Sequence, residues 1–125
     1  MTRLFLFLGA INGFLTVALG AFGAHMLRGE IEPRLYEAFQ TGVEYQGIHA
    51  LVLLFIGMLA EKMTTPWINR SGWLILTGIT LFSGSLYLMA LTGVSALGII
   101  TPIGGISFLL GWLALAFAVL KLPKR

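Results

Sequence analysis

The sequence contains no cysteine and very little charge. Only 10% of its 125 residues are charged, whereas 58% are hydrophobic. The missing cysteine excludes disulfides, thiol redox chemistry and cysteine-ligated zinc or iron–sulfur centres. The shortage of charge excludes an ordinary soluble domain, because about a quarter of the residues in such domains are charged and a chain this small could not bury so much apolar surface. We therefore expect a lipid bilayer to be the solvent of this chain.

The basic residues do not form a patch. The formal net charge is +3, but Lys and Arg are scattered over short polar segments and the two ends of the sequence. Such scattering is typical of topology signals in membrane proteins and not of a phosphate-binding surface. We expect no nucleic-acid partner.

Long apolar segments predict four membrane-spanning helices. About 20 helical residues cross the hydrocarbon core, and we expect spans near residues 4–27, 36–60, 72–92 and 103–121. The uncharged run 71–120 is too long for one crossing and must fold back once, near the glycines and proline of 93–102. The fold class is thus an all-α membrane protein, a single four-transmembrane-helix bundle.

The second span differs from the others at its start. Its uncharged part, 45–60, is too short to cross by itself. The preceding segment, 34–44, places Glu37, Thr41 and Glu44 on one side of a helix and apolar residues on another. We therefore expect this helix to begin as an amphipathic segment at the membrane interface.

Basic residues also predict the orientation. An even number of spans places both termini on one side, and that side carries six basic residues: Arg3, Lys62, Arg70, Lys121, Lys124 and Arg125. The opposite side carries two, Arg28 and Arg34. Because basic residues are retained in the cytoplasm, we expect both termini there.

Polar side chains within the spans are expected to gather in the outer half of the bundle, since they need partners in lipid and face its interior. The candidate binding cluster consists of His25, Gln46, His49, Ser83, Ser85, Tyr87, Thr101 and Ser107. Two interpretations remain open. These groups either form hydrogen bonds between helices, worth about 0.6–2 kcal/mol each, or line a site.

No catalytic residue, metal or cofactor is expected. Glu44 and His49 are five positions apart, which puts them on different helix faces and matches neither His-x-x-x-His nor Glu-x-x-His. Ser83 and Ser85 lack the context of a nucleophile elbow.

Small residues at helical spacing predict where helices approach closely. In the first span they share one helical face. The candidate packing positions are Gly9, Gly13, Gly20, Gly84, Gly104 and Gly105.

Four short motifs carry a resemblance to a known family. They are Gly-Ala-Phe-Gly-Ala-His at 20–25, Tyr-Gln-Gly-Ile-His-Ala-Leu at 45–51, Leu-Phe-Ser-Gly-Ser-Leu-Tyr at 81–87, and Ile-Thr-Pro-Ile-Gly-Gly at 100–105 with Gly111-Trp112. Together they resemble the bacterial inner-membrane family called domain of unknown function 423, or uncharacterised protein family 0382, over essentially the whole chain. The resemblance implies a small multi-pass protein of the bacterial plasma membrane and no activity.

Two functions are expected from different classes. The first is a non-enzymatic accessory, assembly or lipid- or partner-interacting protein, whose partners are the bilayer and either another membrane protein or a second copy. The alternative is a small transporter or binding protein for a polar or amphipathic molecule, using the candidate cluster. Four-span exporters couple to protons through an acidic residue in the first span, where this chain has only Asn12, so His49 or Glu44 would have to titrate instead. A membrane enzyme ranks last.

The first span predicts a retained helix and not a cleaved signal peptide. Arg3 and Ala21-Phe22-Gly23 imitate a signal sequence, but the apolar core is longer than the usual 7–15 or so residues. Intact-mass measurement of the purified protein should show residues 1–24 present. A mature chain that begins near residue 24 or 25 would contradict this prediction.

Overall fold

The computed structural model describes residues 1–63 and 65–123, and its secondary structure is helical. Four long helical stretches follow one another. They are α1 (Thr2–Phe22) with η1 (Gly23–Leu27), α2 (Pro33–Ala60), α3 (Pro66–Gly78) with η2 (Ile79–Ser83) and α4 (Gly84–Thr92), and η3 (Ser95–Ile99) with α5 (Ile100–Val119). η1 is a π-helical turn that ends the first stretch, η2 is a π-helical turn inside the third, and η3 is a 3-10 turn.

Each stretch is long and apolar enough to cross a membrane. Their lengths are 26, 28, 27 and 25 residues, whereas about 20 suffice for the hydrocarbon core. This confirms the predicted fold class, an all-α bundle of four transmembrane helices. Two basic residues used to predict the orientation, Lys124 and Arg125, lie outside the described residues.

The helix starts differ from the expected span boundaries for a local reason. The third stretch begins at Pro66, earlier than the expected residue 72, because Thr65 Oγ1 accepts a hydrogen bond from the Trp67 backbone N–H at 3.3 Å. Proline suits such a first turn, where its missing N–H costs no hydrogen bond. The guanidinium of Arg70 then lies 4.8 Å from the centre of the Trp67 ring. Residues 66–71, which precede the expected span, therefore already belong to the helix.

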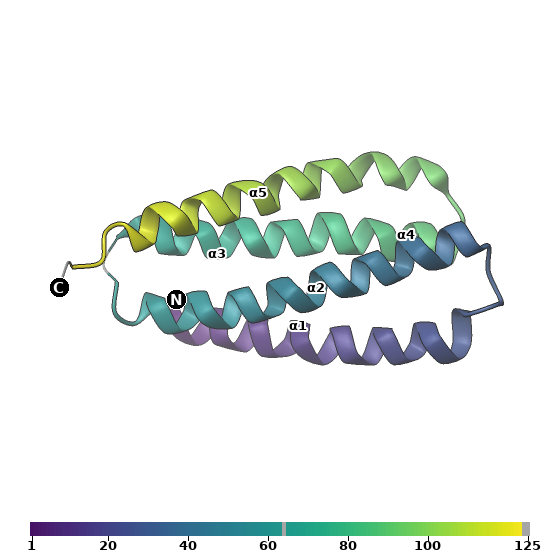
Figure 1. Cartoon of the computed structure of the whole chain (residues 1–125), viewed down its shortest axis with the longest axis horizontal. Coiled ribbons are helices and arrows are strands. Elements are labelled where there is room, and N and C mark those ends of the chain that lie inside the picture. The colour runs from purple at the N-terminus through teal and green to yellow at the C-terminus, as the bar shows by residue number, and fades with distance from the viewer. Residues whose placement is uncertain (64, 124–125) are drawn as a thin grey trace.

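The helices are arranged as two neighbouring pairs (Figure 1). α1 runs beside α2, and α5 runs beside α3 and α4. The N-terminus, the α2–α3 connection and the end of α5 share one end of the bundle. The α1–α2 and α4–α5 connections share the other, so residues far apart in sequence meet at the same depth.

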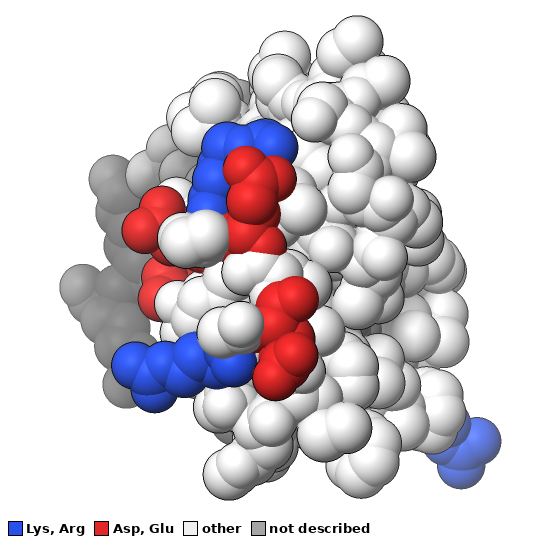
Figure 2. Space-filling model, turned by 90° about the vertical axis from the view of Figure 1, so that its right-hand side faces the viewer, with Lys and Arg blue, Asp and Glu red and all other residues white. Residues whose placement is uncertain are grey.

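Charge is unevenly distributed on the end that carries the α1–α2 connection. Figure 2 looks onto this end, where basic and acidic side chains gather in one region and most of the remaining surface is uncharged. Arg34 and Glu32 form an exposed ion pair there at 3.5 Å. The α4–α5 turn has no charged residue and exposes Val94 and Ile99. The α1–α2 connection is therefore suited to water, and the α4–α5 connection is suited to the membrane interface.

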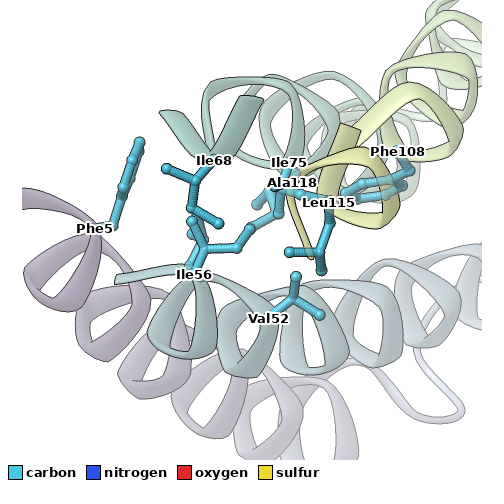
Figure 3. Close-up of a cluster of buried hydrophobic side chains, with 10 residues drawn as sticks. Phe5, Val52, Ile56, Ile68, Ile75, Phe108, Leu115 and Ala118 are labelled. Carbon is cyan, nitrogen blue, oxygen red and sulfur yellow. The ribbon is translucent and has the colours of Figure 1, made fainter. Parts of the chain in front are cut away.

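The main apolar core draws on all four stretches (Figure 3). Phe5, Ile56, Ile68 and Ile75 are almost fully buried, and Leu115 packs against the same cluster. Lipid tails are as apolar as these side chains, so the packing gains dispersion energy through close fit and little hydrophobic driving force. A smaller core around Leu27, Leu35, Phe39 and Ala90 closes the opposite end.

Glycine sets how closely the helices approach. A Cβ on Gly104 would collide with the backbone nitrogen of Phe82, and one on Gly9 would lie 2.9 Å from Leu54. By contrast, nothing lies within 4 Å of a Cβ on Gly13 or Gly84. The six candidate packing glycines therefore differ sharply in their surroundings.

Gly104→Ala should destabilise the bundle by about 1–3 kcal/mol, the usual cost of overpacking, because the backbone of Phe82 cannot move away as a side chain could. Gly84→Ala is the matched control and should be neutral or stabilising by up to about 1 kcal/mol, since it only removes helical glycine. Unfolding in mixed detergent and SDS micelles, followed by circular dichroism, measures both. Equal midpoints for the two variants would contradict the contact.

Candidate functional site

A chain of amide and phenol groups links three helices. The Tyr87 hydroxyl of α4 donates to Gln46 Oε1 of α2 at 2.6 Å. Gln46 Nε2 donates to Asn12 Oδ1 of α1 at 2.8 Å, and Asn12 Nδ2 donates to the Leu8 carbonyl at 2.8 Å. Gln46 and Asn12 are buried. Of these three side chains, Asn12 was not among the predicted site residues, although it is the one amide side chain of the first span.

The serine hydroxyls mostly cap carbonyls of neighbouring helices. Ser83 donates to the Gly42 carbonyl and Ser107 to the Leu74 carbonyl, both at 2.7 Å. Ser85 lies 2.6 Å from the Thr101 hydroxyl, which joins α4 to α5. The same pattern occurs at Ser71, which donates to the Gly111 carbonyl at 2.9 Å. These contacts join neighbouring helices and engage each of these hydroxyls.

The π-helical turn η2 lies where these contacts meet. A π-turn contains more residues per turn than an α-helix, so it widens the helix locally and rotates the faces that follow. Its last residue, Ser83, reaches the Gly42 carbonyl. The widened turn also presses its backbone at Phe82 against Gly104. The bulge is accommodated because α5 has no side chain at that point.

His49 lies between α2 and α5, in contact with aromatic rings. Its Nδ1 is 2.7 Å from the Tyr45 carbonyl, and its Nε2 is 3.1 Å from Trp112 Nε1. Because the indole N–H can only donate, Nε2 accepts and Nδ1 carries the proton. The imidazole also stacks on Phe108, with ring centres 3.7 Å apart. These contacts fix the tautomer and the orientation of the ring.

The structure does not bring the two histidines together. His25 is exposed in η1, at the end of the first span. His49 lies 16 positions after Pro33, about 24 Å along the axis of α2. Within the described ranges, no group of three or more His, Cys, Asp or Glu residues could hold a metal ion. The eight predicted residues thus divide into the Tyr87–Gln46 chain, the serine contacts, the His49 contacts and the separate His25.

Two hollows lie along the line where α2 faces α5, which we call the α2–α5 seam. The first, the His49 hollow, has a volume of about 400 Å³ and is lined by Tyr45, His49, Phe82, Pro102, Gly105, Ile106, Phe108, Leu109 and Trp112. The second, the Phe55 hollow, has a volume of about 370 Å³ and is lined by Leu51, Val52, Phe55, Trp112 and Leu115. Trp112 borders both.

The aromatic residues of the seam were not predicted from the sequence as site residues. Tyr45 and Trp112 stand in motifs of the sequence, but His49 and Trp112 are 63 positions apart. Nothing in either segment alone indicates that α2 and α5 face each other there.

The fold and these contacts define a small four-span integral membrane protein whose polar side chains within the membrane join its own helices. The chain belongs to the family described as "Protein of unknown function (DUF423)", whose family model matches residues 19–105. The predicted family is thereby confirmed.

Relatives match nearly the whole chain. The UPF0382 membrane protein YwdK of Bacillus subtilis is 45% identical over 120 residues, which cover 95% of this chain and 98% of that protein. The UPF0382 inner membrane protein YgdD of Escherichia coli K12 is 38% identical over 124 residues, 99% of this chain and 95% of that protein. No solved structure matches the chain.

Tyr87→Phe should lower the free energy of unfolding by about 0.6–2 kcal/mol, the range for hydrogen bonds between helices in lipid. Tyr36→Phe is the control, because the Tyr36 hydroxyl accepts a hydrogen bond from the exposed Gln40 at 3.2 Å, and this change should alter the free energy of unfolding little. Adding Gln46→Leu to Tyr87→Phe should cost less than the sum of the two single changes. Full additivity in the same micelle unfolding assay would show that the pair does not interact.

Proposed function

We propose that this protein is a non-enzymatic accessory protein of the bacterial inner membrane that binds a lipid or other amphipathic molecule sideways, in the α2–α5 seam. The observation that carries the proposal is the pair of adjoining hollows there, about 400 and 370 Å³ in volume. Ligand sites in bundles are typically concave, largely apolar and placed between helices.

A binding role fits the state of the polar groups. His49, Gln46 and Ser83 each already take part in hydrogen bonds to another helix of the chain. Among the described residues, no buried side-chain nitrogen or oxygen lacks a hydrogen-bond partner. To use one of these groups in catalysis would therefore break a bond that holds two helices together, and an unsatisfied polar group in lipid costs several kcal/mol.

Entry from the bilayer fits the exposure of the seam. Ile106 and Leu109, at the edge of the His49 hollow, are 57% and 65% exposed. A ligand dissolved in the lipid can reach the hollow without crossing water or opening the bundle. A helix of a partner protein or of a second copy could reach the same face, and the test below distinguishes these occupants.

The charged residues support an orientation in the membrane, and the relatives support a location in the inner membrane. We propose that both termini are cytoplasmic, because basic residues gather at the end of the bundle that carries the N-terminus and the α2–α3 connection. Residence in the inner membrane is supported by the printed name of the Escherichia coli relative. His49 lies twelve residues before Glu61, about 18 Å along α2. With Glu61 at the inner edge of a core about 30 Å thick, the His49 hollow lies just on the outer side of the midplane.

Gly105→Leu should block the seam. A Cβ at this glycine meets only Phe82, at 3.9 Å, so the larger side chain is tolerated and extends into the hollow. In nanodiscs containing a phospholipid with a photoreactive acyl tail, adducts on residues 45–55 and 102–115 should fall several-fold in this variant. Mass spectrometry of the digested protein locates them.

Gly13→Leu is the matched control, since nothing lies within 4 Å of a Cβ at this glycine of α1, and adducts in the seam should stay at the level of the unchanged protein. Labelling spread evenly over the four helices, equal in both variants, would contradict lateral binding. Cross-linking of the seam to a second copy would replace the lipid with a protein occupant.

A further inference from the structure

We infer that the two hollows form one binding site for a neutral amphiphile with a flat, hydrogen-bond-accepting ring and a long apolar tail, which is the chemistry of a membrane quinone. This inference rests on the proposed lateral binding in the α2–α5 seam. The ring occupies the His49 hollow and the tail the Phe55 hollow.

The walls of the His49 hollow are suited to a flat ring. Tyr45 and Phe82 have ring centres 4.6 Å apart, and Phe82 and Phe108 have centres 5.5 Å apart. The His49 imidazole stacks on Phe108, and its edge meets Trp112. Aromatic rings prefer such offset or edge contacts with other rings, at about 4.5–7 Å between centres. A planar guest can extend this arrangement, whereas a flexible acyl chain cannot.

Polar groups at the hollow are suited to a guest that accepts hydrogen bonds. Tyr45 lines the hollow and is 40% exposed, and its hydroxyl donates to no other group within residues 1–63 and 65–123. A phenol without a partner in lipid is unfavourable, and a ring carbonyl would supply the missing acceptor. Trp112 N–H, now given to His49 Nε2 at 3.1 Å, is a second donor at the same hollow.

The Phe55 hollow adjoins the His49 hollow and is suited to the apolar tail of a guest whose ring occupies the His49 hollow. Leu51, Val52, Phe55 and Leu115 line it together with Trp112, which it shares with the His49 hollow. From Tyr45 to Phe55 the seam runs about 15 Å along α2. This is half of the hydrocarbon thickness, about 30 Å, so the seam accommodates an extended tail within the membrane.

Depth selects a neutral head group over a phospholipid. His49 and Tyr45 lie about 18 and 24 Å before Glu61 along α2, within a hydrocarbon core about 30 Å thick. Moving a charged phosphate to that depth would cost several kcal/mol of free energy. The free-energy cost for a neutral ring with carbonyl groups is far smaller, and the ring accepts hydrogen bonds from Tyr45 or Trp112.

The test uses the fluorescence of Trp112 in the otherwise intact protein. The chain has three tryptophans, and Trp67→Phe with Trp73→Phe leaves Trp112 as the reporter. Decylubiquinone, titrated into protein in nanodiscs, should quench this fluorescence saturably. Two competitors are then compared: decanol, which has the same tail length and no ring, and a ring analogue that does not quench. The concentration of decanol that displaces the quinone should be at least tenfold higher than that of the ring analogue.

Variants separate the site from simple partition into lipid. Gly105→Leu should weaken decylubiquinone binding at least tenfold, and Gly13→Leu should leave it unchanged. Tyr45→Phe should weaken it about 2- to 12-fold, which is the value of one hydrogen bond of 0.5–1.5 kcal/mol, without altering the affinity for decanol.

The outcomes distinguish this inference from the proposed function. Unsaturable quenching that is equal in Gly105→Leu and Gly13→Leu overturns the ring-binding inference. Equal competition by decanol and by the ring analogue also overturns it, yet leaves lateral binding of a tail intact. Loss of both quinone binding and seam labelling by the photoreactive phospholipid overturns the proposed function as well.

Discussion

A polar side chain buried within a membrane span must find its partner inside the protein, because the hydrocarbon offers none. This constraint organises the bundle. The chain of Tyr87, Gln46 and Asn12 connects α4, α2 and α1, and the serine hydroxyls reach carbonyls on facing helices, as Ser83 does at Gly42. Such bonds replace much of the hydrophobic driving force that lipid removes. They also explain why polar groups in this protein serve its architecture first.

Close approach of the helices makes these bonds possible. A hydroxyl reaches a carbonyl on the next helix only where the backbones are near, and glycine permits this at Gly42, whose Cβ would meet Tyr87 and the Ser83 carbonyl. Gly104 plays the same part against the widened π-turn. Between α2 and α5, where the rings of Phe108 and Trp112 meet His49, the two backbones come close at few points. The two hollows of the seam therefore lie where the helices do not pack closely. Aromatic side chains line them because rings fill wide spaces at low entropic cost.

Sequence reasoning recovered the fold because a membrane span is encoded locally. The length of an apolar run, the charges that interrupt it and the glycine and proline that end it can all be read from neighbouring residues. It missed the start of the third stretch at Pro66, since the hydrogen bond from Trp67 to Thr65 outweighs the polar appearance of the segment. It predicted that polar side chains would gather in the outer half, but the separate contacts of His25 and His49 depend on helix rotation, which small residues alone do not specify.

The sequence by itself determined the number of crossings, the bilayer as solvent, the family and the residues available for polar contacts. Only the tertiary structure decided which of them meet, because partners such as His49 and Trp112 lie 63 positions apart and come together through the rotation of α5 about its axis. That rotation is set by whole-helix packing, including the contact of Gly104 with the Phe82 backbone. It cannot be read from the hydropathy of either segment, since α5 carries large apolar residues on every side.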